Sequence, residues 1–218
     1  MPITLIMFDL DGTLVDTSQD ITNALNYAVE PFALKKLTVR DTIKMVGEGV
    51  TRLIEKVCGE NQGDLREAVI QRFLDYYSNH LTDHSVLYPN VTKTLEKLHK
   101  YRKVVISNKR ENLSRELLEK LQLLQYFELV IGSDTTPEKK PSAVPLIHAI
   151  EKCNVIPEEA VMVGDSKFDV EAGKRAGVKT IAVAYGYGEK TDLFEADYVI
   201  DSIDALPLIL DMNSLKFI

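Results

Sequence analysis

Two aspartates, one residue apart, follow an apolar run near the N-terminus. The segment LIMFDLDGT places Asp9 and Asp11 on the same side of an extended strand, while Leu10 points to the other side. Buried carboxylates are costly unless a partner compensates their charge. Gly12 then permits a sharp exit from the strand, which a side chain would hinder. The pattern predicts two carboxylates that face one small volume and need a partner from outside the protein.

Polar residues also follow other apolar runs of the chain. Ser107 and Asn108 close one run, Asp134 closes another, and Asp165 with Ser166 closes a third. Ligands of open parallel sheets bind beyond the carboxyl ends of the strands, so we expect these side chains at one edge. Carboxylates gathered in one crevice repel one another unless a cation compensates them. Since hard oxygen ligands favour Mg²⁺, the sequence predicts a magnesium site at this edge.

Short apolar runs alternate with amphipathic patterns along most of the chain. The apolar runs, which we expect to be strands, cover residues 4–10, 103–108, 128–134, 160–166, 180–186 and 197–201. Apolar residues at three- and four-residue intervals predict helices over 112–124, 143–155 and 167–178. Continuously apolar strands that alternate with such helices are typical of a parallel sheet covered on both faces. The sequence therefore predicts an α/β fold with a doubly wound, Rossmann-like parallel sheet.

One segment departs from this alternation. Residues 17–86 hold several helical patterns and no convincing strand. Pro89 and the polar stretch before it mark the return to the core pattern. We therefore expect residues 1–16 and 87–218 to form the α/β core, and residues 17–86 to form a helical cap domain inserted between the first two core strands.

Composition limits the classes of partner. Hydrophobic residues make up 45% and charged residues 27% of the 218, as in ordinary globular proteins. A formal net charge of -7 disfavours nucleic acid and membrane surfaces as partners. Cys58 and Cys153 are the two cysteines and form no CxxC pair, so neither a disulfide framework nor a cysteine zinc site is expected. With no leader pattern and no apolar run of membrane-spanning length, we expect a cytoplasmic protein.

Four short motifs follow one another along the chain. They are DLDGTL (9–14), VISNK (105–109), the Lys140-Pro141 pair, and GDSKFDVEAG (164–173). In this order the chain resembles the haloacid dehalogenase superfamily of phosphatases, in its phosphoglycolate phosphatase-like branch with a helical cap. The resemblance extends to YGYGEK and ADYVIDSIDAL near the C-terminus. Two positions depart from the family pattern, because Ala143 stands where proline is frequent and Asn90 where glycine is common.

The resemblance implies roles for the acidic residues. Asp9 would attack phosphorus and form an aspartyl-phosphate, and Asp11 would act as general acid and then as general base. Mg²⁺ would be held by Asp9, by the backbone carbonyl of Asp11 and by Asp165. Asp169 would support this metal site.

The resemblance also implies groups that hold the phosphate. Ser107 and Asn108 would bind the phosphoryl oxygens, and Lys140 would supply a fixed positive charge. Lys139 is an alternative to Lys140, but only Lys140 directly precedes the proline. Taken singly these residues have simpler explanations, since a lysine in a loop is usually solvated.

The helical insert is expected to cover the site. In GEGVTRL (47–53) two glycines precede Arg52, which we take as a candidate substrate-binding residue; the alternative is that the glycines only end one helix and begin another. Thr13 and Thr17 are interpreted as hinge or capping residues, and Tyr76 with Tyr77 as packing residues.

The function that these features favour is Mg²⁺-dependent hydrolysis of a small phosphorylated metabolite, such as 2-phosphoglycolate, through an aspartyl-phosphate. A phosphosugar mutase would use the same intermediate and stays an alternative. A dehalogenase is disfavoured because it needs neither Asp11 nor Mg²⁺, and a non-catalytic phospholigand-binding module is disfavoured by the intact acidic set. The sequence predicts no oligomeric state.

Overall fold

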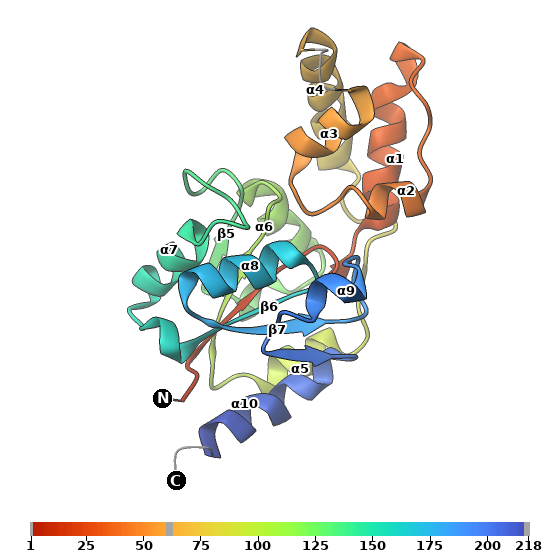
Figure 1. The fold of residues 1–218 in the computed structure, drawn as a ribbon. Coiled ribbons are helices and arrows are strands. Elements are labelled where there is room, and N and C mark those ends of the chain that lie inside the picture. Colours follow the sequence, from red (N-terminus) through yellow and green to blue (C-terminus); the bar gives the residue numbers. More distant parts are fainter. Residues whose placement is uncertain (1, 60–62, 216–218) are drawn as a thin grey trace.

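The expected core strands form one sheet. The computed structural model describes residues 2–59 and 63–215, and within them six parallel strands lie in the order β5-β4-β1-β6-β7-β8 (Figure 1). The strands are β1 (Leu5–Phe8), β4 (Arg102–Ile106), β5 (Leu129–Ile131), β6 (Ala160–Gly164), β7 (Lys179–Val183) and β8 (Tyr198–Ile200). The prediction of a doubly wound α/β fold is confirmed, and each strand lies within one of the apolar runs, give or take one residue.

Helices cover both faces of the sheet because successive strand residues point to opposite sides. In β1, Leu5 and Met7 pack with the apolar residues of α7 and α8. Ile6 and Phe8 join the larger core on the other face, with the apolar residues of α5, α6 and α10. The core helices are α5 (Val91–Lys97), α6 (Glu111–Lys120), α7 (Val144–Cys153), α8 (Lys167–Ala176), α9 (Lys190–Leu193) and α10 (Leu206–Leu215).

Helices α1 to α4 form a separate group beyond the carboxyl edge of the sheet (Figure 1). They pack through apolar residues that include Ile21 and Leu25 of α1 and Phe73 and Tyr77 of α4. Their bounds are α1 (Ser18–Val29), α2 (Val39–Ile43), α3 (Val50–Cys58) and α4 (Gly63–Asn79).

Two linkers join this helical group to the sheet, and they pair with each other. The short strands β2 (Val15–Asp16) and β3 (Val86–Leu87) run antiparallel. The carboxylate of Asp20 accepts hydrogen bonds from the backbone N–H groups of His84 and Ser85 and from the Ser85 hydroxyl. The two linkers are therefore held side by side. This pairing was not expected, because two residues carry no recognisable strand pattern.

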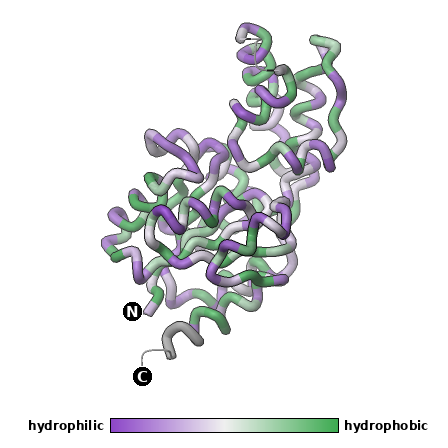
Figure 2. The backbone as a smooth tube through the Cα atoms, viewed as in Figure 1, coloured by the Kyte–Doolittle hydropathy of each residue, from purple (hydrophilic) through white to green (hydrophobic). Residues whose placement is uncertain are grey.

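The distribution of hydropathy follows the layers. Hydrophobic residues concentrate along the strands, and the outer turns and loops are mostly hydrophilic (Figure 2). In the part of the chain that the structure describes, no helix is long and apolar enough to cross a membrane.

Candidate active site

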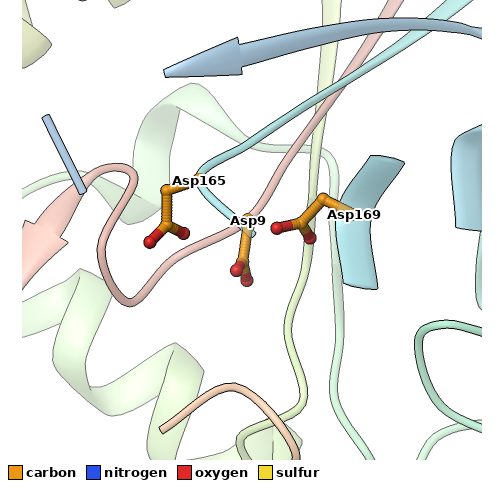
Figure 3. A group of neighbouring side chains, drawn as sticks. All are labelled: Asp9, Asp165 and Asp169. Carbon is orange, nitrogen blue, oxygen red and sulfur yellow. The ribbon is translucent and has the colours of Figure 1, made fainter. Parts of the chain in front are cut away.

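Three carboxylates meet at the carboxyl edge of the sheet. Asp9 follows β1, Asp165 follows β6, and Asp169 lies in the first turn of α8. Each offers an oxygen within 4.8 Å of the others, and all three side chains are buried. Figure 3 shows Asp9 between Asp165 and Asp169, with the carboxylates directed into one volume. The parallel strand order brings them together, because β6 is the direct neighbour of β1.

Gly12 makes this close approach possible. Its φ of +85° lies in the left-handed region, and a Cβ atom there would lie 2.3 Å from Oδ2 of Asp165. A side chain at this position would both strain the backbone and displace Asp165. The sharp exit expected from the DLDG sequence is therefore present.

One buried lysine lies among these carboxylates. Nζ of Lys140 is 2.9 Å from Oδ1 of Asp9 and 2.6 Å from Oδ1 of Asp169. The other oxygen of Asp169 accepts hydrogen bonds from the backbone N–H and the hydroxyl of Ser166 at the start of α8. Asp169 thus holds Lys140 against Asp9. Burial lowers the pKa of Lys140, but the charges of Asp169 and Asp9 outweigh burial and raise it above its usual value.

Electrostatics favour a cation at this site. Burial, followed by the charge of Asp169, raises the pKa of Asp165 to about 7. Burial also raises the pKa of Asp9 well above its usual value, although the charge of Lys140 opposes the increase. A hard divalent cation would relieve both penalties and would find only oxygen ligands here. The residues present therefore fit Mg²⁺.

Asp165 is oriented by two further contacts. Oδ1 accepts a hydrogen bond from the hydroxyl of Thr13 at 3.1 Å, and Oδ2 accepts one from the backbone N–H of Tyr187 at 2.7 Å. The hydroxyl of Tyr187 in turn contacts Asp16 and the backbone N–H of Thr17 in the first linker. The same loop thus touches the acidic site and the linker to the helical group.

Asp11 lies beside the three carboxylates and faces a different set of partners. Its Oδ1 accepts hydrogen bonds from the hydroxyl of Thr17 at 2.7 Å and from Nζ of Lys109. Lys109 also donates to the hydroxyl of Tyr77, at 2.9 Å. Since Tyr77 belongs to α4, a residue of the helical group contacts the partner of Asp11.

Ser107 and Asn108 follow β4 at the same edge and are buried. The Ser107 hydroxyl accepts a hydrogen bond from the backbone N–H of Lys109. The side-chain NH₂ of Asn108 donates to the carbonyls of Gly47 and Lys140, at 2.6 and 2.9 Å. Asn108 therefore ties the loop of the helical group to the loop that carries Lys140.

A cavity of about 490 Å³ lies between the sheet edge and the helical group. Its floor includes Asp9, Asp11, Asp165, Ser107 and Asn108. The opposite wall combines apolar side chains with cations. The apolar residues include Ile43, Val46, Leu53 and Phe73, and the cations of the whole cavity are Lys44, Lys56, Lys109, Arg110 and Lys167.

The predicted site residues fall into three places. Asp9, Asp11, Asp165, Ser107 and Asn108 line the cavity, and Lys140 and Asp169 lie behind Asp9 rather than in the wall. Arg52 is not part of the cavity wall; its guanidinium lies 2.8 Å from Glu55, and its side chain is 59% exposed. Lys139, the alternative to Lys140, donates instead to the carbonyl of Glu48.

Sequence reasoning missed several residues of this site. Lys109 belongs to the VISNK motif, and a lysine next to a polar strand end is a usable signal, but the motif alone assigns it no role. Tyr77 packs as expected, stacked on Phe73, and it also lines the cavity. Thr13 and Thr17 were assigned no chemical part, whereas both bond to carboxylates of the site.

Known proteins are similar to this chain in both sequence and fold. Residues 6–183 match the family model of the haloacid dehalogenase-like hydrolases. The chain is 40% identical over 211 residues to a phosphoglycolate phosphatase of Chromobacterium violaceum, covering 94% of this chain and 95% of that protein. It is 36% identical over 215 residues to a phosphoglycolate phosphatase of Aquifex aeolicus, covering 98% and 99% of the two chains. The chain therefore belongs to the haloacid dehalogenase-like hydrolase family.

A solved structure agrees with this assignment. The crystal structure of a predicted phosphoglycolate phosphatase from Haemophilus somnus 129PT superposes with a TM-score of 0.88 at 28% identity, covering 95% of this chain and 97% of that one. The resemblance seen in the sequence is thus confirmed, and with it the assignment to the phosphatases of this family.

Proposed function

We propose that the protein is a Mg²⁺-dependent phosphatase that hydrolyses a small phosphorylated carboxylate, with 2-phosphoglycolate as the first candidate, through an aspartyl-phosphate on Asp9. The arrangement of Asp9 carries the proposal. Its Oδ1 is held by the backbone N–H of Leu10 and by Lys140, while the carboxylate faces the cavity. A carboxylate fixed in this way is ready for in-line attack on phosphorus.

Asp11 would act as the general acid in the first step and as the general base in the second. It lies on the same side of the chain as Asp9 and lines the same cavity. In the first step it would protonate the leaving oxygen, and in the second it would accept a proton from the attacking water. Ser107, the loop of Asn108 and Lys140 would hold or balance the phosphoryl group, the lysine acting from behind Asp9.

Mg²⁺ would be held by Asp9, by the backbone carbonyl of Asp11 and by Asp165, with Asp169 as support. The ion would supply charge compensation between the carboxylates and the phosphate dianion. Thr13 and the backbone N–H of Tyr187 would keep Asp165 oriented for this task, as outer contacts of metal ligands do.

The helical group would act as a cap that selects the substrate. We assign residues 17–86 to this cap and residues 1–16 and 87–218 to the core. A phosphorylated carboxylate carries a second anion, and the cavity wall offers Lys44 and Arg110. Among the described residues neither forms an ion pair within 4.0 Å, although the charge of Lys44 acts on Asp41. The relatives named phosphoglycolate phosphatase support a substrate of this kind.

Phosphate release from a panel of phosphomonoesters tests the proposal. We expect turnover of 2-phosphoglycolate that vanishes in EDTA and returns with Mg²⁺, and that Ca²⁺ restores poorly because its coordination shell is larger and looser. Full turnover in excess EDTA would remove the metal from the mechanism.

The same assay separates hydrolysis from phosphoryl transfer to a sugar. In ¹⁸O-labelled water the released phosphate should carry the label, since water attacks phosphorus in the second step. Isomerisation of a hexose phosphate that is faster than phosphate release from any monoester would instead identify a mutase. Binding of phosphate esters without turnover would identify a binding module.

A further inference from the structure

Lys109 links the core to the cap at the carboxylate of Asp11. Only 7% of its side-chain surface is exposed. Its Nζ contacts Oδ1 of Asp11 on one side and the hydroxyl of Tyr77 on the other. The lysine lies three residues after the end of β4 in the core, whereas Tyr77 lies in the cap helix α4. One ammonium group therefore bridges the catalytic edge and the cap.

The cap side of this bridge is buried and packed. Tyr77 is 1% exposed, and its ring stacks on that of Phe73 at 5.2 Å between centroids. The ammonium of Lys109 also lies 5.1 Å from the centre of the Tyr77 ring, where the π face attracts a cation. A lysine has a flexible four-carbon stem, so its ammonium is positioned by its partners rather than by its own geometry. Tyr77 is the partner that the cap supplies.

The core side of the bridge orients Asp11. Oδ1 receives both the Lys109 ammonium and the Thr17 hydroxyl, and among the described residues no hydrogen bond is made to Oδ2. Two donors on one oxygen fix the rotation of the carboxyl group. They leave Oδ2 as the atom that can carry a proton into the cavity.

We propose that Lys109 is a positioning residue for the general acid Asp11, and that the hydroxyl of Tyr77 makes this positioning depend on a docked cap. The inference rests on the proposed phosphatase function and assigns two residues to it. Without the Tyr77 contact, Asp11 would be oriented as a general acid whatever the position of the cap. With the contact, Asp11 is oriented when the cap is docked and has closed the cavity against water.

The proton and bond changes balance in both steps. As Asp9 forms its O–P bond and the ester P–O bond breaks, the proton on Oδ2 of Asp11 passes to the leaving oxygen. The carboxylate that remains is stabilised by the Lys109 ammonium. When water attacks phosphorus and the Asp9–phosphate bond breaks, a proton of that water returns to Asp11, and Asp9 is regenerated as a carboxylate.

The dependence on the leaving group tests this role. An alkoxide needs a proton in order to leave, whereas p-nitrophenolate leaves without one, so loss of the acid slows only the alkyl ester. The ratio kcat/KM is the correct measure, because it reports the steps up to departure of the leaving group. We expect Lys109→Met to lower kcat/KM about 100-fold for 2-phosphoglycolate and ethyl phosphate, but less than about threefold for p-nitrophenyl phosphate.

Variants of Tyr77 in the cap and of the positive charge of Lys109 extend the test. Tyr77→Phe keeps the ring and its stacking, and we expect it to lower kcat/KM for the alkyl esters about tenfold with the same sparing of the aryl ester. Lys109→Arg, which keeps a buried cation and its donors, should recover part of the activity. Tyr76→Phe is the matched control: it removes a hydroxyl one residue away on the same helix, where the ring stacks on Tyr27 and His80, and should change neither ester.

Two results would overturn the inference. Equal losses for alkyl and aryl esters in Lys109→Met would show that the lysine binds the phosphoryl group or supports the fold, and the thermal midpoint distinguishes those two. An unchanged Tyr77→Phe would remove the cap from the assembly of the acid. Failure of the proposed function itself is separate, because wild-type protein would then release no phosphate from either class of ester.

Discussion

The carboxyl edge of the sheet and the cap wall face each other across one cavity, yet they are built in different ways. At the sheet edge Asp9, Asp165 and Lys140 are buried. Lys140 is ion-paired with Asp9, and Asp165 accepts a hydrogen bond from the backbone N–H of Tyr187. In the cap wall, apolar side chains lie beside exposed cations such as Lys44 and Lys56. Desolvated groups held by hydrogen bonds and ion pairs suit the bond-making step, and a wall of apolar and cationic side chains suits selection of the substrate. Changes at the edge should therefore affect chemistry, and changes in the cap should affect which substrate is used.

The largest effect is expected at the edge. Asp9→Asn removes the nucleophile and should lower kcat about 10⁴-fold, with little change in KM. The same variant removes one of several buried like charges, so its thermal midpoint in EDTA should be equal to or above that of the wild type. Phosphate release and thermal unfolding measure the two effects. Near-normal turnover would assign the nucleophile elsewhere.

The second prediction concerns stability without metal. Because the pKa of Asp165 is raised to about 7 from the ordinary 3.8, the folded protein binds this proton more tightly than the unfolded chain does. The stabilisation is complete below the ordinary value and is lost as the pH rises through the raised one. Between about pH 5 and about pH 8 the wild type in EDTA should therefore lose about 2 kcal/mol relative to Asp165→Asn, which has no such proton.

Denaturant unfolding of both proteins at several pH values measures this difference. Mg²⁺ should abolish it for the wild type, because the cation favours the ionised carboxylate. A difference that does not change with pH would mean that Asp165 is not under electrostatic strain in the folded protein.

A third, smaller effect is expected in the cap wall. Lys44→Met should raise KM for 2-phosphoglycolate about tenfold while changing kcat little, because it removes a partner of the substrate's second anion. Ethyl phosphate, which lacks that anion, should be unaffected. Arg52→Met is the informative companion, since Arg52 is the substrate-binding candidate that the sequence suggested. A larger effect of Arg52→Met would assign substrate selection to Arg52, which does not line the cavity, rather than to Lys44 in its wall.

The smallest effect is expected where the cap loop at Gly49 meets the core loop at Asn108, a contact that we call the seam. Gly49 has a φ of +80°, and a Cβ there would lie 2.8 Å from the carbonyl oxygen of Asn108. Gly49→Ala should lower kcat/KM about fivefold, because the cap loop must move away from the core. Gly59→Ala is the matched control: its φ is +87°, and none of the described residues beyond its chain neighbours lies within 4 Å of an added Cβ. It shares the backbone strain, so equal losses in both variants would exclude a role for the seam.

The sequence by itself determined the fold class and much of the sheet edge. Strands and helices have local periods, so apolar runs and amphipathic patterns identified the six strands and the helices α6, α7 and α8 within a few residues, but not α5, α9 and α10. Parallel strands end at one edge, so residues such as Asp9 and Asp165 could be grouped before their distances were known.

Only the tertiary structure decided the partners of these residues. Lys109 is 98 residues from Asp11 and 32 from Tyr77 along the chain, and no local pattern encodes such contacts. The same holds for Lys139 and Lys140, adjacent lysines of which one reaches the cap loop and the other Asp9. The directions of these two lysine side chains depend on how the loop that carries them packs between the cap and the sheet. Spacing along a chain records the period of a single element, whereas neighbours across a cavity depend on the packing of many elements.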